Sequence, residues 1–341
     1  MRRRIAVRRA RRRTHSSILL LAAGALCAAA TPSLAQDTLR FTPTVGYSTF
    51  AVRDPVGRVR PGTVLVSRTM HDAYYDVGGG TFPGEVGPFW VEGAQPGDML
   101  VVEILKVRPN HTLAASQISQ SLGGLSADPR SPMLNDPVPR RRYEWALDRE
   151  KMTGTIKLPD SRVGEMTIAL KPMLGRVAVA PSGQEAFSNM WPGNFGGNMD
   201  APEVREGTTV YLPVFHEGAY FYFGDGHAAQ GDGELNGSGL ETSMDVALKI
   251  GLVKGKRIDW PRLEDANYIM VAGSARPLID ALRIAHIELV KWLETEYGFN
   301  RWDAYELLGQ LAESTVANVV DPNYTVVAKF PKKYLPPPVS R

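Results

Sequence analysis

The residues best suited to chemistry are concentrated in one glycine-rich stretch, GDGHAAQGDGELNGSGLE, at positions 224–241. Asp225 and His227 are two residues apart, and so are Asp232 and Glu234. In an extended chain residues i and i+2 face the same side, so each pair can direct its side chains at one point. These groups suit a divalent metal ion or an acid–base pair, and the stretch contains no lysine or arginine to neutralise them. The alternative is a polar hairpin loop built from Asp-Gly turns.

Other parts of the chain carry further candidate ligands. The stretch HDAYYDVGGG, at 71–80, contains Asp72, and the stretch NMWPGNFGGNMD, at 189–200, ends on Asp200. Glu92 lies in an otherwise apolar segment, where it is either an exposed residue or a carboxylate directed into a site. Because glycine lets the backbone turn tightly and approach a ligand closely, we expect these acids to join the central stretch in one site.

The first 35 residues have the features of an export signal. Eight arginines precede the apolar run 18–30, and Ser33-Leu34-Ala35 provides a small-residue cleavage site. The apolar run is short for a membrane span, so an uncleaved anchor is the less favoured alternative. We therefore expect a signal peptide over 1–35, one catalytic domain over 36–334 and a proline-rich tail over 335–341. The mature protein is expected to be periplasmic or secreted, with no membrane partner.

Removal of the signal changes the charge of the chain. The full sequence has a formal net charge of +3, and loss of eight arginines and no acidic residue leaves −5. The basic balance therefore belongs to the signal, and nucleic-acid binding loses its support. Cys27, the only cysteine, is removed too. The mature protein is thus expected to have no thiol nucleophile, disulfide or cysteine-ligated zinc.

Hydrophobic patterning predicts a mainly β fold, with sandwich- or barrel-like sheets and two C-terminal helices. The principal predicted strands are 63–69, 100–107, 208–214, 219–223 and 244–253. Leucine and alanine recur at helical spacing from Leu278 to Leu293, directly after Pro277. An Asp303-x-x-Glu306 arrangement predicts the start of a second helix that continues through Asn318. The proline-containing region 110–150 is expected to be a long surface excursion.

Several segments resemble the acetamidase/formamidase family. They are GPFWVEGAQPGDMLVVEI at 87–104, GNFGGNMD at 193–200, TVYLPVFHEGAYFYFGDGHAAQGDGE at 209–234, and GLE at 239–241. The resemblance implies an amidohydrolase that acts on a small linear amide such as formamide or acetamide and releases ammonia and a carboxylate. It also implies a mostly β fold with helices late in the chain and a homo-oligomer.

Amide hydrolysis needs a nucleophile, a group that polarises the carbonyl and an acid for the leaving nitrogen. The sequence has no G-x-S-x-G elbow. Acids and histidine on glycine-rich loops instead favour water activated by a divalent metal ion, with a carboxylate as general base. Zinc is the first expectation, and an additional all-oxygen calcium site is compatible with the same acids.

The candidate roles are as follows. The expected metal ligands are Asp72, Asp200, Asp225, His227 and Glu241; the expected catalytic acids and bases are Glu234, Glu92 and Asp232; and the expected substrate-binding amides are Asn194 and Asn198. Two alternative functions remain: hydrolysis of a larger or cyclic amide, or non-catalytic binding of a small molecule by an exported protein of the same fold. Turnover distinguishes them.

Overall fold

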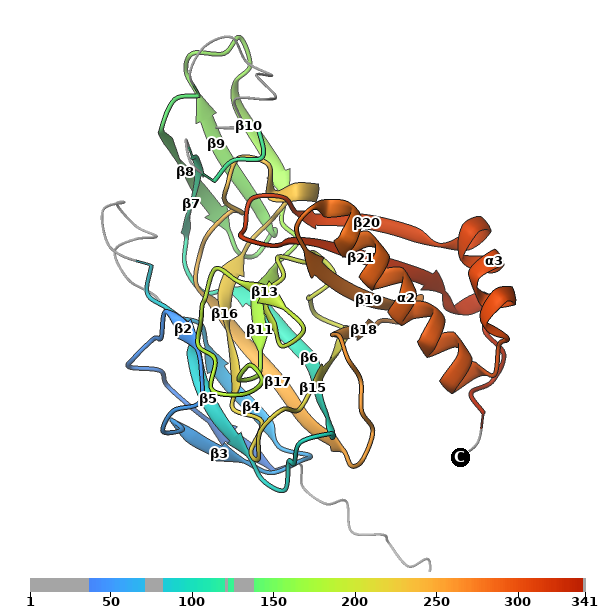
Figure 1. The fold of residues 1–341 in the computed structure, drawn as a ribbon. Helices are drawn as coiled ribbons and strands as arrows, with labels where there is room; N and C mark the ends of the chain where they lie inside the picture. Colours follow the sequence, from blue (N-terminus) through green and yellow to red (C-terminus); the bar gives the residue numbers. More distant parts are fainter. Residues whose placement is uncertain (1–36, 71–81, 120–121, 126–137, 340–341) are drawn as a thin grey trace, which may run out of the picture. The chain divides into compact units, whose positions relative to one another are not determined.

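The computed structural model describes residues 37–70, 82–119, 122–125 and 138–339 (Figure 1). Strands predominate in these segments, and the two α-helices come late in the chain. The expectation of a mainly β fold with two C-terminal helices is therefore confirmed. The expected signal peptide lies outside the described residues. Among the described helices, none combines the length and the apolar character needed to cross a bilayer.

The largest sheet has nine strands, nearly all of them antiparallel. Their order is β1 (Thr38–Arg40), β4 (Val64–Arg68), β17 (Met244–Val253), β6 (Met99–Pro109), β15 (Thr209–Pro213), β18 (Arg262–Glu264), β19 (Tyr268–Ala275), β21 (Tyr324–Pro331) and β20 (Glu313–Asn318). The long pair β6 and β17 is its centre, with Leu248 opposite Ile104 and Ile250 opposite Val102. Alternating apolar residues on these strands give the sheet one buried face.

A six-stranded sheet carries the chemistry-bearing stretch. Its order is β13 (Pro192–Gly193), β14 (Gly196–Asn198), β11 (Met173–Ala178), β16 (Phe221–His227), β5 (Val86–Val91) and β3 (Gly57–Val59). The strand predicted over 219–223 continues to His227, so the first residues of the glycine-rich stretch are sheet. A two-stranded sheet pairs β12 (Phe187–Ser188) with β2 (Thr49–Phe50). Single 3₁₀ turns lie at η1 (Asp232–Glu234) and η2 (Lys332–Tyr334).

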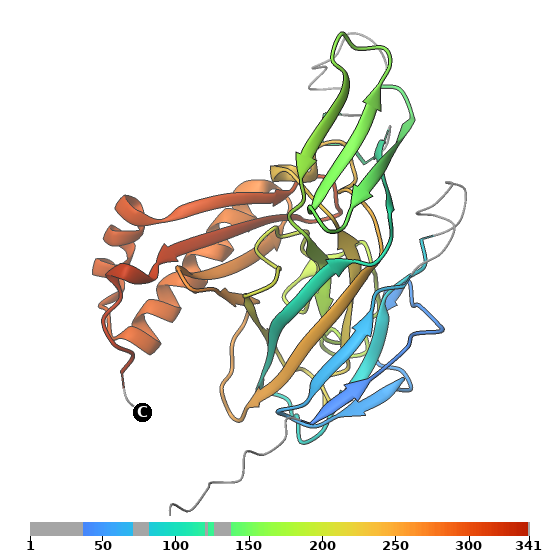
Figure 2. The same ribbon diagram turned by 180° about the vertical axis from the view of Figure 1, so that it is seen from behind.

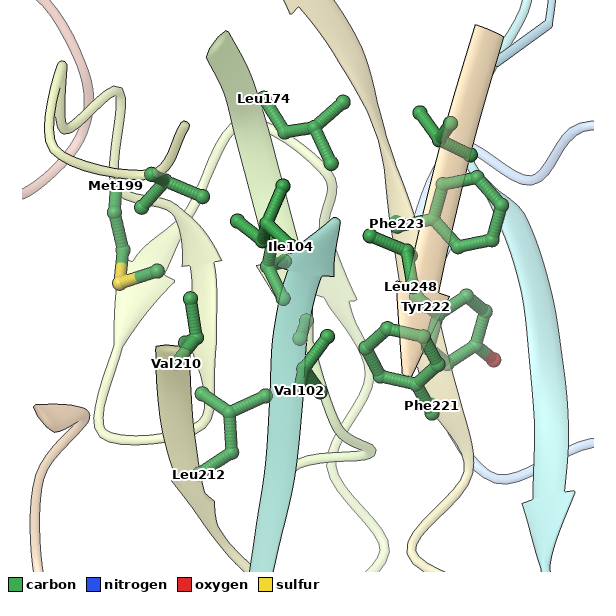
Figure 3. Packing of buried hydrophobic residues seen from close by; sticks show 14 of the residues in the cluster. Val102, Ile104, Leu174, Met199, Val210, Leu212, Phe221, Tyr222, Phe223 and Leu248 are labelled. Atoms are coloured by element: carbon green, nitrogen blue, oxygen red, sulfur yellow. The ribbon is translucent and has the colours of Figure 1, made fainter. Parts of the chain in front are cut away.

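The main core lies between these two large sheets. Figure 3 shows Val102, Ile104 and Leu248 of the nine-stranded sheet gathered with Leu174 and Phe223 of the six-stranded sheet. Each of these side chains is 2% exposed or less. Burial of a large apolar side chain contributes roughly 1.5–3 kcal/mol, so this layer holds the two sheets together.

Both α-helices, α2 (Leu278–Tyr297) and α3 (Arg301–Leu311), lie on the same face of β19 and β21 (Figures 1 and 2). The predicted apolar stripe of α2 supplies Ala285, Leu289 and Leu293 to this second core.

The second helix differs from its prediction at both ends. Its N-cap is Asn300, whose side chain accepts a hydrogen bond from Trp302 N, rather than a residue at 303. The helix ends at Leu311, and 313–318 form β20 along the edge of β21. A segment containing Thr315 and Val316 can satisfy its backbone groups on that edge, and β-branched residues favour a strand.

The region 110–150 is also more regular than expected. It contains β7 (Leu113–Ile118) and β8 (Arg141–Asp148), which join β9 (Thr153–Leu158) and β10 (Gly164–Ala169) in a four-stranded antiparallel sheet. In RRYEWALD the large apolar residues Tyr143, Trp145 and Leu147 occupy alternate positions, which is the pattern of a strand. The prolines at 129, 132 and 137 lie outside the described residues. At the other end of the chain, residues after Leu335 are held to α2, because Val339 N donates to Glu296 O over 2.8 Å.

Strand β6 provides a matched test of the core. Leu100 is fully buried and Leu105, on the same strand, is 44% exposed. We expect Leu100→Ala to lower the free energy of unfolding by about 2–5 kcal/mol, because it leaves a cavity between the sheets. Leu105→Ala should change it by no more than about 0.5 kcal/mol. Denaturant unfolding measures both, and equal losses would contradict the assignment of the buried face.

Candidate functional site

Strand β16 and the chain that returns beside it bring three predicted residues together. Asp225 and His227 share one face of the strand, with Asp225 Oδ2 3.4 Å from His227 Nε2. After η1 the chain turns back, and Glu241 pairs with His227 in an isolated β-bridge. This places Glu241 Oε1 3.2 Å from the same Nε2 atom. Two carboxylates and one imidazole nitrogen therefore converge on one point.

A second group of predicted residues shares the same histidine. Asp200 follows β14, and Glu234 ends η1. Ligand atoms of Asp200, His227 and Glu234 lie within 4.8 Å of one another, as do those of Asp225, His227 and Glu241. The structure thus gathers four of the expected residues, Asp200, Asp225, Glu234 and Glu241, around His227.

Gln230, which sequence reasoning missed, fixes the orientation of this imidazole. Its Nε2 donates to Asp200 O (2.7 Å) and Ala317 O (3.0 Å), so its Oε1 is left as an acceptor. Oε1 lies 2.8 Å from His227 Nδ1, and that contact requires a proton on Nδ1. In a neutral imidazole, Nε2 then presents a lone pair to two carboxylates. The lone pair and the negatively charged oxygens repel one another, and only a proton or a metal cation between them removes this repulsion.

Three further charged residues at the site come from distant parts of the chain. Glu85, just before β5, accepts hydrogen bonds over 2.9 Å from Arg176 Nη1 and from Asn189 Nδ2. Asp321, after β20, accepts one over 2.6 Å from Asn198 Nδ2. The sequence did carry one signal for Arg176, because it is the single charged residue in the otherwise apolar segment MLGRVA. The structure shows that this segment is a fully buried strand. The presence of Arg176 corrects the inference, drawn from local sequence, that no basic residue neutralises these acids.

The site buries more negative than positive charge. Six carboxyl groups are 7% exposed or less: Glu85, Asp200, Asp225, Glu234, Glu241 and Asp321. The permanently charged group among them is the Arg176 guanidinium, joined by His227 when it is protonated. Burying unpaired carboxylates is costly, so the cluster must bind protons or cations.

Burial sets the direction of most pKa shifts. It raises the pKa of Glu234 and that of Asp321 well above their usual values, and the neighbouring charge of Asp200 adds to both shifts. Burial opposes ionisation of Asp225 as well, but there the charges of Arg176 and His227 prevail and lower its pKa to about 2. The site therefore holds a firmly ionised ligand beside carboxyl groups that retain protons in the absence of another cation.

The donor set fits a bound cation. Oε2 of Glu241 and Oδ1 of Asn198 have no hydrogen-bond donor among the described residues, and the Asp200 carboxylate faces the Asp321 carboxyl, which can donate to it only when protonated. Imidazole nitrogen with carboxylate oxygen suits zinc, and oxygen atoms alone suit calcium. Asp200, Asp225 and Glu234 also adopt left-handed backbone conformations, with φ of 45°, 56° and 50°. Such conformations are unfavourable for residues other than glycine and concentrate at functional sites.

A cavity of about 150 Å³ is lined by six of the charged residues: Arg176, Asp200, Asp225, Glu234, Glu241 and Asp321. Glu85 and His227 contact these residues but are not part of the lining. Besides the charged residues it is lined by Phe82, Gln117, Leu122, Asn189, Met190, Asn198, Gly237, Ser238 and Val320. The aromatic side chains of β16 point elsewhere: Phe221, Tyr222 and Phe223 belong to the core (Figure 3).

Three predicted site residues are placed away from this cavity, and a fourth is not among the described residues. Glu92 lies beyond β5, where it is 44% exposed and its Oε2 is 3.3 Å from Arg60 Nε. Asp232 is exposed, because the 3₁₀ turn with Gly233 at φ 83° replaces the extended geometry that would align it with Glu234. Asn194 lines a different cavity. Asp72 lies outside the described residues.

The close approach of two carboxylates depends on Gly175. A methyl group at this position would overlap both Asp200 Oδ1 and Asp225 Oδ2. We expect Gly175→Ala to weaken zinc binding about 10- to 100-fold, the usual effect of disturbing groups that orient metal ligands. Gly231→Ala is a matched control, because a methyl group there meets no atom within 4 Å. Calorimetric titration of both variants with zinc tests this, and unchanged affinity in Gly175→Ala would contradict the crowded site.

Comparison with known proteins assigns the chain to a family. The model of the Acetamidase/Formamidase family matches residues 162–335. The chain is 29% identical over 238 residues to an acetamidase of Mycolicibacterium smegmatis, covering 56% of this chain and 58% of that protein. It is 27% identical to a formamidase of Methylophilus methylotrophus, covering 49% of this chain and 51% of that protein. The matches thus span just over half the length of these curated relatives.

A solved structure extends the similarity to most of the chain. The crystal structure of an acetamidase from Yersinia enterocolitica superposes with a TM-score of 0.78 at 32% sequence identity, covering 88% of this chain and 94% of that chain. The fold, the matched region and the motifs agree. The chain belongs to the acetamidase/formamidase family.

Proposed function

We propose that this protein hydrolyses a small linear amide, such as formamide or acetamide, to ammonia and a carboxylate. The observation that carries the proposal is the convergence of Asp225 and Glu241, which line a cavity of about 150 Å³, on the buried imidazole of His227. A cavity of this size favours a substrate of few non-hydrogen atoms over a larger or cyclic amide. Family membership supports the reaction type.

We propose two positions for divalent cations. Asp225, His227 and Glu241 would hold zinc, and Asp200, on the oxygen-rich part of the site, would contribute to a site for zinc or an additional calcium ion. A bound divalent cation supplies positive charge that polarises the amide carbonyl and makes water more acidic.

Glu234 is the proposed proton carrier. It lines the cavity, and burial raises the pKa of its carboxyl well above the usual value. When water adds to the carbonyl carbon, its proton passes to the Glu234 carboxylate. When the carbon–nitrogen bond breaks, the same proton passes to the nitrogen, so that ammonia leaves. Asn198 Oδ1, for which the described residues provide no donor, can accept a hydrogen bond from the amide nitrogen of the substrate.

The cellular setting is also a proposal. The arginine-rich, apolar N-terminal sequence supports action after export, and the family resemblance supports a homo-oligomer. Helices α2 and α3 expose Ile287, Trp302 and Tyr305 around an apolar groove, which would suit contact between copies of the chain.

Ammonia release from formamide and acetamide tests the proposed reaction. We expect the mature protein to release ammonia, to lose this activity on treatment with a chelator, and to regain it when zinc is added. Release that is indifferent to chelation would contradict the role of a metal. No release from either amide would contradict the small-amide substrate and favour a larger amide or a binding protein.

Glu234 and Asp232 form a matched pair within one turn. We expect Glu234→Gln to lower kcat about 10²- to 10⁴-fold, because the amide cannot carry the proton. Asp232→Asn, at the exposed neighbour, should leave kcat unchanged. Steady-state ammonia release measures both variants, with zinc content determined in parallel. A Glu234→Gln variant that keeps full zinc content and full turnover would contradict the assigned role.

A further inference from the structure

We propose that Arg176 binds the carbonyl oxygen of the substrate, and this inference rests on the proposed amidase function. Arg176 lies on β11 and is 4% exposed, and it lines the cavity that holds the converging carboxylates. Its guanidinium carbon is 4.5 Å from the centroid of the Phe82 ring, which also lines the cavity. Packing thus fixes the plane of the guanidinium at the wall of the site.

Within the described part of the chain, hydrogen-bond donors of this guanidinium remain without an oxygen acceptor. Nη1 donates to Glu85 Oε1 over 2.9 Å and lies 3.5 Å from Asp225 Oδ1. Nη2 has only the sulfur of Met190, at 3.3 Å, which is a weak acceptor, and Nε has no acceptor among the described residues. Buried donors are normally paired, so the Nη2 side of Arg176 lacks an oxygen acceptor that a ligand can supply.

The negative charge of the site favours a neutral ligand at this position. Glu85 and Asp225 already compensate the guanidinium charge from the Nη1 side. A carboxylate placed near Nη2 would add another negative charge to a site that contains six acids, whereas a neutral carbonyl oxygen would use the free donors without adding charge. The geometry therefore favours the neutral amide over its carboxylate product.

The apolar neighbours of Arg176 limit the group attached to that carbonyl. Phe82 stacks on the guanidinium, and Met190 contacts Nη2. With the carbonyl oxygen on Nη2, the acyl group would meet these two side chains. A hydrogen atom or a short alkyl group fits this environment in a cavity of about 150 Å³.

The test compares two buried arginines. Arg176→Lys keeps a positive charge opposite Glu85 but loses the planar set of donors. We expect kcat/KM for acetamide to fall at least about 10-fold, the loss expected when a charged hydrogen bond is removed, while zinc content and Tm stay at wild-type values. Arg262→Lys is the control: Arg262 is 6% exposed, lies 3.8 Å from Glu296 and stacks on Trp292, and it lines another cavity. Its kcat/KM should be unchanged.

The outcomes separate this inference from the proposed function. A wild-type protein without amide turnover would overturn both. Wild-type turnover with an equally active Arg176→Lys would overturn the role of Arg176 alone, and so would a loss of activity accompanied by loss of zinc. Stronger inhibition by acetate than by a non-hydrolysed neutral amide would also overturn it.

A double variant covers the case in which Arg176→Lys does not fold. E85M/R176M removes both members of the buried pair, so that neither Glu85 nor Arg176 is left buried without the other. Retained Tm and zinc content with at least about a 10-fold loss of kcat/KM would support the inference, since the carbonyl loses its donor in this variant too. Undiminished kcat/KM would overturn it.

Discussion

The structure depends on the burial of six carboxyl groups around one imidazole and one guanidinium. Such a cluster is unstable in a protein interior unless positive charge accompanies it. Arg176 provides part of that charge, and the orientation of His227 leaves a place for more. Because Gln230 requires the proton on Nδ1, the lone pair of Nε2 and two carboxylates face one another. The same arrangement that is costly without a cation makes a strong binding site for one.

The fold makes this convergence possible through close backbone packing. Strand β16 is flanked by β11 and β5, so residues of three strands meet at one place. Glycine is required where the acids crowd the backbone: a methyl group at Gly175 would overlap Asp200 and Asp225, and one at Gly224 would overlap Glu85. The large core between the sheets supplies the rigidity that holds these groups, and the cluster can retain unfavourable backbone conformations because the surrounding sheet fixes them.

The cavity is small because the large side chains of β16 pack in the core and only smaller polar side chains of this strand reach the site. The aromatic residues of β16 pack in the core, while Asp225, farther along the strand, lines the cavity and contacts His227. Phe82 and Met190 contact Arg176 in the cavity wall, and the lining also includes five acidic residues. An apolar end beside a polar, charged end suits a short acyl group joined to an amide. The family relationship and the shape of the cavity therefore favour the same kind of substrate.

The sequence by itself determined the strand-rich fold, the late helices and the central stretch of the site. Periodicity is a local property, and Asp225, His227, Glu234 and Glu241 are close enough in sequence to be recognised together. Local patterns could not determine where α3 ends, because the free edge of β21 decided between helix and strand at 313–318.

Only the tertiary structure decided the rest of the site. Arg176 reaches it because β11 pairs with β14 and β16, which places this residue opposite Asn198 and Gly224. Glu85 and Asp321 arrive from still more distant segments, and no spacing in the sequence relates them to His227. Conversely, the turn at Gly233 directs Glu234 into the site and leaves Asp232 exposed, although the two residues are close in sequence. The physical reason is the same in each case: strand pairing and backbone dihedral angles, rather than distance along the chain, set which charges share a buried volume.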